Sequence, residues 1–101
     1  MSWSFEWSDD AARQYRKLDR QEQRRIDEWV TSHLDGCDDP TSMGHRLKGS
    51  LVMLWRYRIG DYRLLCHLED GRLVVLGLEI EKRDTVYKDR RHKGRRNRYG
   101  R

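Results

Sequence analysis

The chain has 101 residues, of which 36% are hydrophobic and 39% are charged, and its formal net charge at pH 7 is +5. This length accommodates one domain with a small core, and no apolar run approaches the roughly 20 residues that span a bilayer. Residues 1–6 lack the basic and apolar regions of a signal peptide, so we expect a cytoplasmic protein without a membrane partner.

Cysteine and histidine usage does not indicate a disulfide framework or a metal site. Cys37 and Cys66 are the only cysteines, and a single disulfide between them is compatible with the sequence. Cys66 lies in an apolar run, which favours a buried, small hydrophobic residue. The cysteines and the four histidines show no paired ligand spacing, so we expect no metal and no other cofactor.

The excess of positive charge is confined to the C-terminal end. Residues 88–101 hold eight Lys or Arg and one Asp, a net charge of +7, whereas the other 87 residues hold 14 basic and 16 acidic side chains. A basic run of this kind, with no apolar periodicity, is typical of a flexible segment. We therefore predict a folded domain over residues 1–87 and a basic, flexible tail over residues 88–101.

The first half of the chain predicts a strand followed by two helices. Large apolar and polar side chains alternate over residues 3–7, which indicates a half-buried strand. Ser8 and Asp19 are the expected N-caps of the two helices. The first helix is expected to bury Ala12, Tyr15 and Leu18. The apolar stripe of the second consists of Ile26, Trp29, Val30, His33 and Leu34, and His33 is expected to be a packed or boundary histidine.

The second half predicts strands. Residues 35–50 contain several turn signals and are interpreted as a loop or a poorly formed edge. Strands are expected at about 51–59, 62–69 and 72–81, joined by hairpin turns, and the last is apolar on both faces and should lie inside the sheet. The order β-α-α-β-β-β predicts an α+β fold with a small antiparallel sheet and two N-terminal helices packed on one face.

Three arginines are expected on the open face of this sheet. Alternation places Arg56 and Arg58 opposite to the aromatic Trp55 and Tyr57, and Arg63 of the next strand can lie beside them. Like charges facing each other across strands destabilise a sheet unless an anion lies between them. Because guanidinium groups bind phosphate oxygens bidentately, these arginines form a candidate phosphate site. Ordinary solvated surface residues are the alternative interpretation.

Further cations follow the last strand. Lys82 and Arg83 lie at its end, and Tyr87 is placed to stack on a base, to exchange a proton, or merely to pack. The tail can bind RNA phosphates, dock an acidic segment of another protein, or keep the chain soluble. Its candidate RNA-binding residues are Arg90, Arg91, Lys93, Arg95 and Arg96.

Four motifs in order resemble the RelE/ParE superfamily of toxins from type II toxin–antitoxin systems, and most closely its RelE branch. They are Leu47-Lys48-Gly49-Ser50, Trp55-Arg56-Tyr57-Arg58-Ile59, Tyr62-Arg63-Leu64, and Lys82-Arg83 followed by Tyr87. The resemblance covers roughly residues 3–87. It implies a cognate antitoxin as partner, and an endoribonuclease that needs no metal and cleaves mRNA in the ribosomal A site. There the ribose 2′-OH attacks the adjacent phosphodiester, which inhibits translation.

The resemblance also implies roles for single residues. Arg56 and Arg58 match basic strand positions that contact the RNA backbone and stabilise charge, and Arg63 matches the arginine that holds the scissile phosphate. Arg83 matches the arginine near the leaving group, and Tyr87 the tyrosine that stacks on the base or transfers a proton. Lys48, Lys82 and the basic tail are expected to bind mRNA or ribosomal RNA.

One departure from the RelE pattern leaves the general base open. RelE has lysines where this chain has Arg56 and Arg58, and an arginine stays protonated. The candidates are His45, which matches a carboxylate base of YoeB-type toxins, together with Tyr87, His67, Glu79 and Glu81. The alternatives to a nuclease are a ParE-like inhibitor of DNA gyrase and a non-catalytic RNA-binding module.

Overall fold

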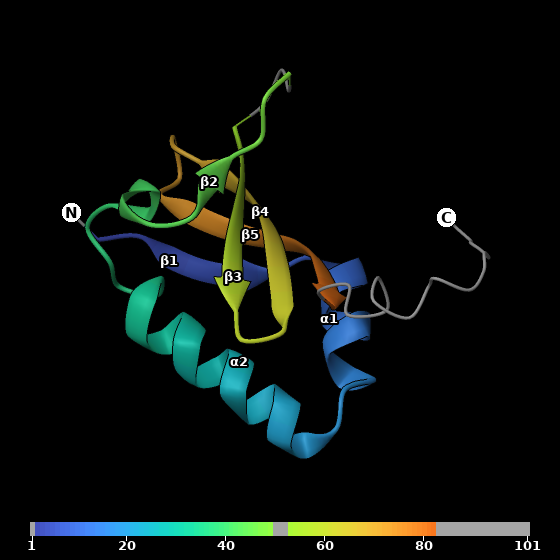
Figure 1. Cartoon of the computed structure of the whole chain (residues 1–101). Coiled ribbons are helices and arrows are strands. Elements are labelled where there is room, and N and C mark those ends of the chain that lie inside the picture. Colours follow the sequence, from blue (N-terminus) through green and yellow to red (C-terminus); the bar gives the residue numbers. More distant parts are fainter. Residues whose placement is uncertain (1, 50–52, 83–101) are drawn as a thin grey trace.

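The computed structural model describes residues 2–49 and 53–82, and every structural statement below concerns these residues (Figure 1). They form two α-helices, a short 3-10 helix and five strands. In chain order these are β1 (Ser4–Trp7), α1 (Asp9–Arg16), α2 (Arg20–His33), the 3-10 helix η1 (Pro40–Ser42), β2 (His45–Arg46), β3 (Leu54–Ile59), β4 (Tyr62–Glu69) and β5 (Val74–Lys82).

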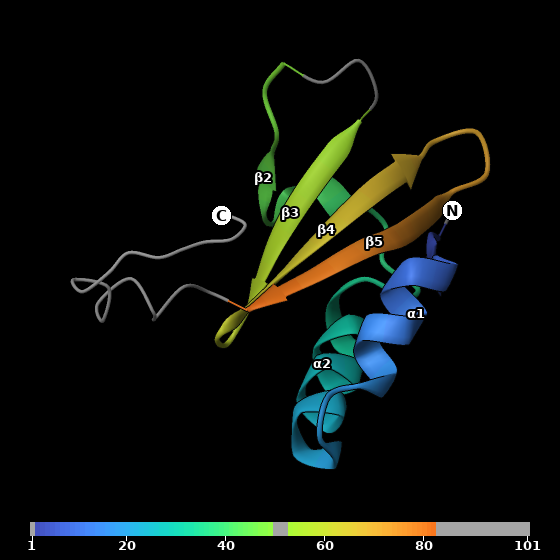
Figure 2. The same cartoon turned by 90° about the vertical axis from the view of Figure 1, so that its right-hand side faces the viewer.

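The strands form one sheet in the order β1-β5-β4-β3-β2, and both helices lie on the same side of it (Figure 2). The predicted α+β class and the one-sided packing of the helices are confirmed. The prediction of an antiparallel sheet is wrong for one pair, because β1 runs parallel to β5. No hairpin joins β1 to its neighbour. Two helices follow it, and the chain then enters the sheet at the opposite edge.

Both predicted helix starts are capped by the expected side chains. The Ser8 hydroxyl accepts a hydrogen bond from the Ala11 N–H at 3.1 Å, and the Asp19 carboxylate accepts one from the Glu22 N–H at 2.8 Å. Such caps satisfy N–H groups that have no partner within the helix. On α1 the fully buried residue is Ala11, whereas Ala12 was predicted and is only partly buried.

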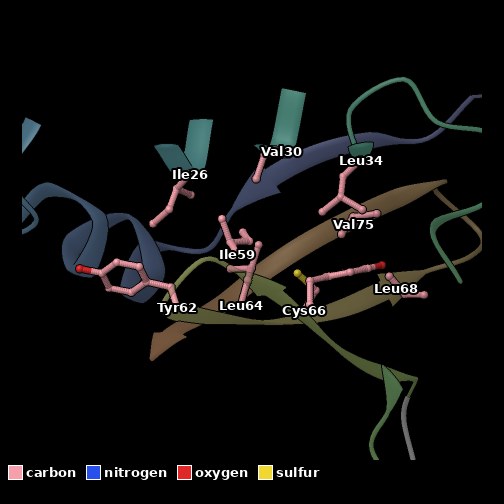
Figure 3. Packing of buried hydrophobic residues seen from close by; sticks show 10 residues of the cluster. Ile26, Val30, Leu34, Ile59, Tyr62, Leu64, Cys66, Leu68 and Val75 are labelled. Carbon is pink, nitrogen blue, oxygen red and sulfur yellow. The ribbon is translucent and has the colours of Figure 1, made fainter. Parts of the chain in front are cut away.

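The core lies between α2 and the helix-facing side of the sheet (Figure 3). Ile26 and Val30 of α2 and its C-cap Leu34 are buried against sheet residues such as Leu64 and Cys66. Cys66 is fully buried, as predicted, and burial raises the pKa of its thiol. Neither helix within the described residues is long and apolar enough to cross a membrane.

Strand β5 is paired on both sides, by β1 and by β4, as its apolar sequence predicted. Its alternation is interrupted by a bulge, since Cys66 pairs with Gly77 but Leu65 pairs with Glu79, which leaves Leu78 as an extra residue. Because of this extra residue, Glu79 and Glu81 lie on the open face of the sheet, the same face as Arg63.

Candidate functional site

A groove of about 410 Å³ lies at the edge of the sheet, where β2 leaves β3. Only two residue pairs join these strands, His45 with Arg56 and Arg46 with Trp55. Beyond Arg56, this edge of β3 has no strand partner among the described residues and borders the groove. Eight residues line the groove: Trp29, Met43, Gly44, His45, Arg56, Tyr57, Arg58 and Arg63. Four of these are residues that the sequence singled out as candidates for catalysis.

The strand register brings the basic side chains together in two rows across the sheet. In the first row His45 pairs with Arg56. In the second row Arg58 of β3 lies directly opposite Arg63 of β4, which in turn lies opposite Glu81 of β5. Two facing arginines repel each other unless an anion lies between them. The arrangement therefore fits a phosphodiester group.

The arginines of the groove are not neutralised by the described part of the chain. Within residues 2–49 and 53–82, no carboxylate forms an ion pair with Arg56, Arg58 or Arg63. The Nε of Arg56 is buried and has no hydrogen-bond acceptor among the described residues. A buried donor without a partner costs roughly 1–3 kcal/mol. An anionic oxygen bound in the groove would supply the missing acceptor.

The neutral wall of the groove is held in place by hydrogen bonds to the loop before β2. The hydroxyl of Tyr57 donates to the backbone oxygen of Pro40 at 2.6 Å, and the indole N–H of Trp55 donates to that of Met43 at 2.6 Å. Burial raises the pKa of Tyr57, so this phenol stays protonated at neutral pH. Tyr57 therefore shapes the groove and is unsuited to proton transfer.

Several predicted residues lie away from the groove. Lys48 is exposed in the turn after β2. Lys82 pairs with Tyr62, so its position belongs to the helix-bearing face and not to the face of Arg63. Outside the described residues lie the catalytic candidates Arg83 and Tyr87 and the tail candidates Arg90, Arg91, Lys93, Arg95 and Arg96.

The alternative candidates for a general base differ in their distance along the sheet from the arginines. His45 lines the groove. His67 lies on the open face between Leu54 and Leu76, and its Nδ1 is 3.6 Å from a carboxylate oxygen of Glu69. Among the candidate bases that the structure describes, His45 is thus the one paired directly with Arg56. No three His, Cys, Asp or Glu side chains among the described residues are grouped as a metal site would require.

Sequence reasoning missed half of the groove lining. Trp29 was assigned to the core, Met43 and Gly44 to an unspecified loop, and Tyr57 only to packing. Gly44 carried a usable signal, because glycine in a turn often permits a positive φ, and its φ is +77°. Nothing in the sequence indicated that Trp29 of α2 would border the arginines of β3.

Comparison with known proteins connects this geometry to a family. The family model for the ParE toxin of the type II toxin–antitoxin system parDE matches residues 5–87. No curated protein sequence matches the chain.

Solved toxin structures share the fold. The chain is similar to the RelBE2 toxin–antitoxin complex of Mycobacterium tuberculosis, with a TM-score of 0.71, 24% identity, and coverage of 82% of this chain and 93% of that chain. It is also similar to the archaeal RelE–RelB complex of Pyrococcus horikoshii OT3, with a TM-score of 0.66, 20% identity, and coverage of 84% of this chain and 99% of that chain. The isolated E. coli RelE toxin has a TM-score of 0.66 and 17% identity, with coverage of 87% of this chain and 94% of that chain. The chain therefore belongs to the ParE toxin family of type II toxin–antitoxin systems, within the RelE/ParE superfamily.

Proposed function

We propose that this toxin binds the mRNA backbone in the groove and cleaves it on the translating ribosome. The observation that carries the proposal is the set of three arginines, Arg56, Arg58 and Arg63, which converge on one groove without an ion-pair partner among the described residues. Fixed cations of this kind stabilise the charge that develops on a phosphorane, which is often the largest catalytic contribution.

In the proposed reaction the scissile phosphate lies between Arg58 and Arg63, which face each other across β3 and β4. The ribose 2′ oxygen bonds to phosphorus as the P–O5′ bond breaks. His45, in its neutral form, takes the proton of the 2′-OH, and the departing 5′ oxygen takes up a proton. The products are a 2′,3′-cyclic phosphate and a 5′-hydroxyl. By resemblance to RelE-type toxins, Arg83 and Tyr87 would act at the leaving group.

The partners of this proposed activity are the ribosome, its mRNA and a cognate antitoxin. Two of the similar solved structures are complexes of a toxin with its antitoxin. An antitoxin that inhibits this chain would have to cover or fill the arginine groove. The proposed activity places the toxin in the cytoplasm, where ribosomes translate.

The proposal is tested by expressing the toxin in cells and mapping the 5′ ends of mRNA. The wild type should produce cuts within translated codons, and Arg63→Ala should reduce them by roughly 10²–10³-fold, since it removes a charge from the transition state. Arg72→Ala is the matched control. Arg72 is also an exposed arginine, but it lies in the turn between β4 and β5, is paired with Glu69 at 2.6 Å and is outside the groove.

Inhibition of DNA gyrase is the second candidate function, and the match to the ParE toxin family favours it. Toxicity with DNA-damage signalling and without mRNA cuts would overturn the nuclease proposal and support this candidate. Ribosome binding without cuts or toxicity would instead indicate a non-catalytic RNA-binding module.

A further inference from the structure

One wall of the groove contains an indole that packs against the core but is not fully covered by it. Trp29 lies on the buried stripe of α2, where its neighbours Ile26 and Val30 are only 1% and 6% exposed. Trp29 itself remains partly exposed and lines the groove. Its ring is therefore accessible to a ligand that enters the groove.

This indole is held in a fixed orientation. The ring of His33 stacks on it with a centroid separation of 4.5 Å and an interplanar angle of 22°. The Nδ1 of His33 lies 2.9 Å from the backbone oxygen of Trp29, which fixes the imidazole in this position. Tyr57 lies on another side at 5.6 Å. A ring that is already ordered loses little conformational entropy when a ligand binds.

The groove thus combines an aromatic surface with a cationic one. Trp29 comes from α2, while Arg56 and Arg58 come from β3 and Arg63 from β4. Sites for single-stranded nucleic acid have this composition, because phosphates bind the cations while bases stack on aromatic rings. A small anion would bind the arginines alone, whereas a nucleotide would use both the arginines and the ordered indole beside them.

We propose that Trp29, backed by His33, is the surface on which one RNA base stacks while a neighbouring phosphate binds the arginines. This inference rests on the proposed binding of RNA in the groove. Trp29 is then a positioning and specificity residue, since stacking orients the nucleotide but transfers no proton. Purines have larger stacking surfaces than pyrimidines, so the toxin should prefer a purine at the stacked position.

The experiment is an in vitro translation assay with reporter mRNAs whose codons are randomised at one position, read out by mapping and counting the cut ends. Trp29→Leu should lower cleavage at the preferred contexts by roughly 5- to 100-fold, the range found for loss of one base–aromatic stack. It should also flatten the base preference. Trp29→Phe should keep part of the cleavage rate and part of the base preference, and His33→Ala should weaken the base preference.

The matched control is Trp7→Leu, which removes another partly buried indole. Trp7 lies on β1 at the opposite edge of the sheet and packs against Phe5 at a centroid separation of 4.8 Å. This variant should retain the base preference of the wild type. Because the side chain of His33 is exposed, His33→Ala keeps the test valid if Trp29→Leu fails to fold.

The possible outcomes separate this inference from the proposed function. If the wild type makes no cuts, the proposed function fails and the inference fails with it. If the wild type cuts and both Trp29→Leu and His33→Ala keep its rate and base preference, only the inference is overturned. A uniform loss at all contexts, shared with Trp7→Leu, would show a purely structural role and would also overturn it.

Discussion

Gly44 determines how closely β2 approaches β3. Its φ is +77°, and a Cβ at this position would lie 2.6 Å from the backbone oxygen of Arg56 and 2.8 Å from the ring of Tyr57. Only a residue without a side chain permits this approach. The close approach is what places His45 beside Arg56 at the mouth of the groove.

We expect Gly44→Ala to lower the free energy of unfolding by roughly 2–4 kcal/mol, since it adds left-handed strain to a steric overlap with backbone. Gly49→Ala is the control, because Gly49 has a φ of +79° but nothing within 4 Å of an added Cβ. It should cost only about 1–2 kcal/mol, the strain alone. Urea unfolding measures both, and equal losses would contradict the role given to the overlap.

Side-chain directions on the sheet were predictable only where alternation is regular. Arg56, Arg58 and Arg63 lie on strands without a bulge between them, so counting by two placed them on one face. Lys82 follows the bulge at Leu78, which no sequence pattern predicts. Alternation counted from the start of β5 therefore does not predict the face on which Lys82 lies. Trp29 was missed because helical periodicity separates buried from exposed positions but does not identify what lies beside a boundary position.

Helices α1 and α2 are joined by one hydrogen bond between side chains. The hydroxyl of Tyr15 donates to a carboxylate oxygen of Asp27 at 2.5 Å. Desolvation, with a further contribution from Asp27, raises the pKa of Tyr15 to about 12. In the unfolded chain this phenol titrates near its ordinary value of 10.0, so the unfolded state loses the proton first as the pH rises.

The stability contributed by this raised pKa is present below pH 10 and should be lost as the pH rises from 10 to about 12. Tyr15→Phe removes the titrating group, so its unfolding free energy should fall less steeply over the same range. Burial also raises the pKa of Tyr57 and Tyr62, and some loss should therefore remain. Denaturant unfolding at a series of pH values measures the difference, and identical slopes would contradict it.

Local signals predicted the helices and hairpins well, but not every pairing. Capping residues fixed the starts of α1 and α2, and the turn at Gly60 and Asp61 fixed the pairing of β3 with β4. The direction of β1 depends on contacts with β5, about 70 residues away, and no local pattern encodes it. The turn before β5 also runs longer than predicted, to Leu73, which has a φ of 55°.

Over the whole molecule, two groups of basic residues have different expected roles. The groove concentrates three arginines at one edge of the sheet. The eight basic residues of positions 88–101 lie outside the described structure, and their roles stay predictions from charge alone. The predicted division into a domain over residues 1–87 and a tail over residues 88–101 likewise stays a prediction.

A chain that ends at Tyr87 would hold 14 basic and 16 acidic side chains, a net charge of −2 instead of +5. We expect it to bind ribosomes more weakly, with a flatter dependence on salt, because each lost phosphate contact lowers the log–log slope by roughly 0.7–0.9. Ribosome binding measured between about 50 and 200 mM salt tests this. As a control, Arg63→Ala in the full chain should change the slope of log affinity against log salt by no more than the contribution of about one phosphate contact. Equal slopes for the full and the shortened chain would contradict the prediction.

The extra residue in β5 has a consequence for how the gene can change in length. Removing Leu78 alone would leave Glu79 opposite Leu65 and Ile80 opposite Leu64, because Leu78 is the one residue of the bulge without a partner on β4. An insertion within residues 79–82 would instead turn the side chains that follow it to the opposite face of the sheet, so it should be far more harmful than the deletion of Leu78. The bulge is therefore a place where β5 can lose one residue while its core side chains keep their face.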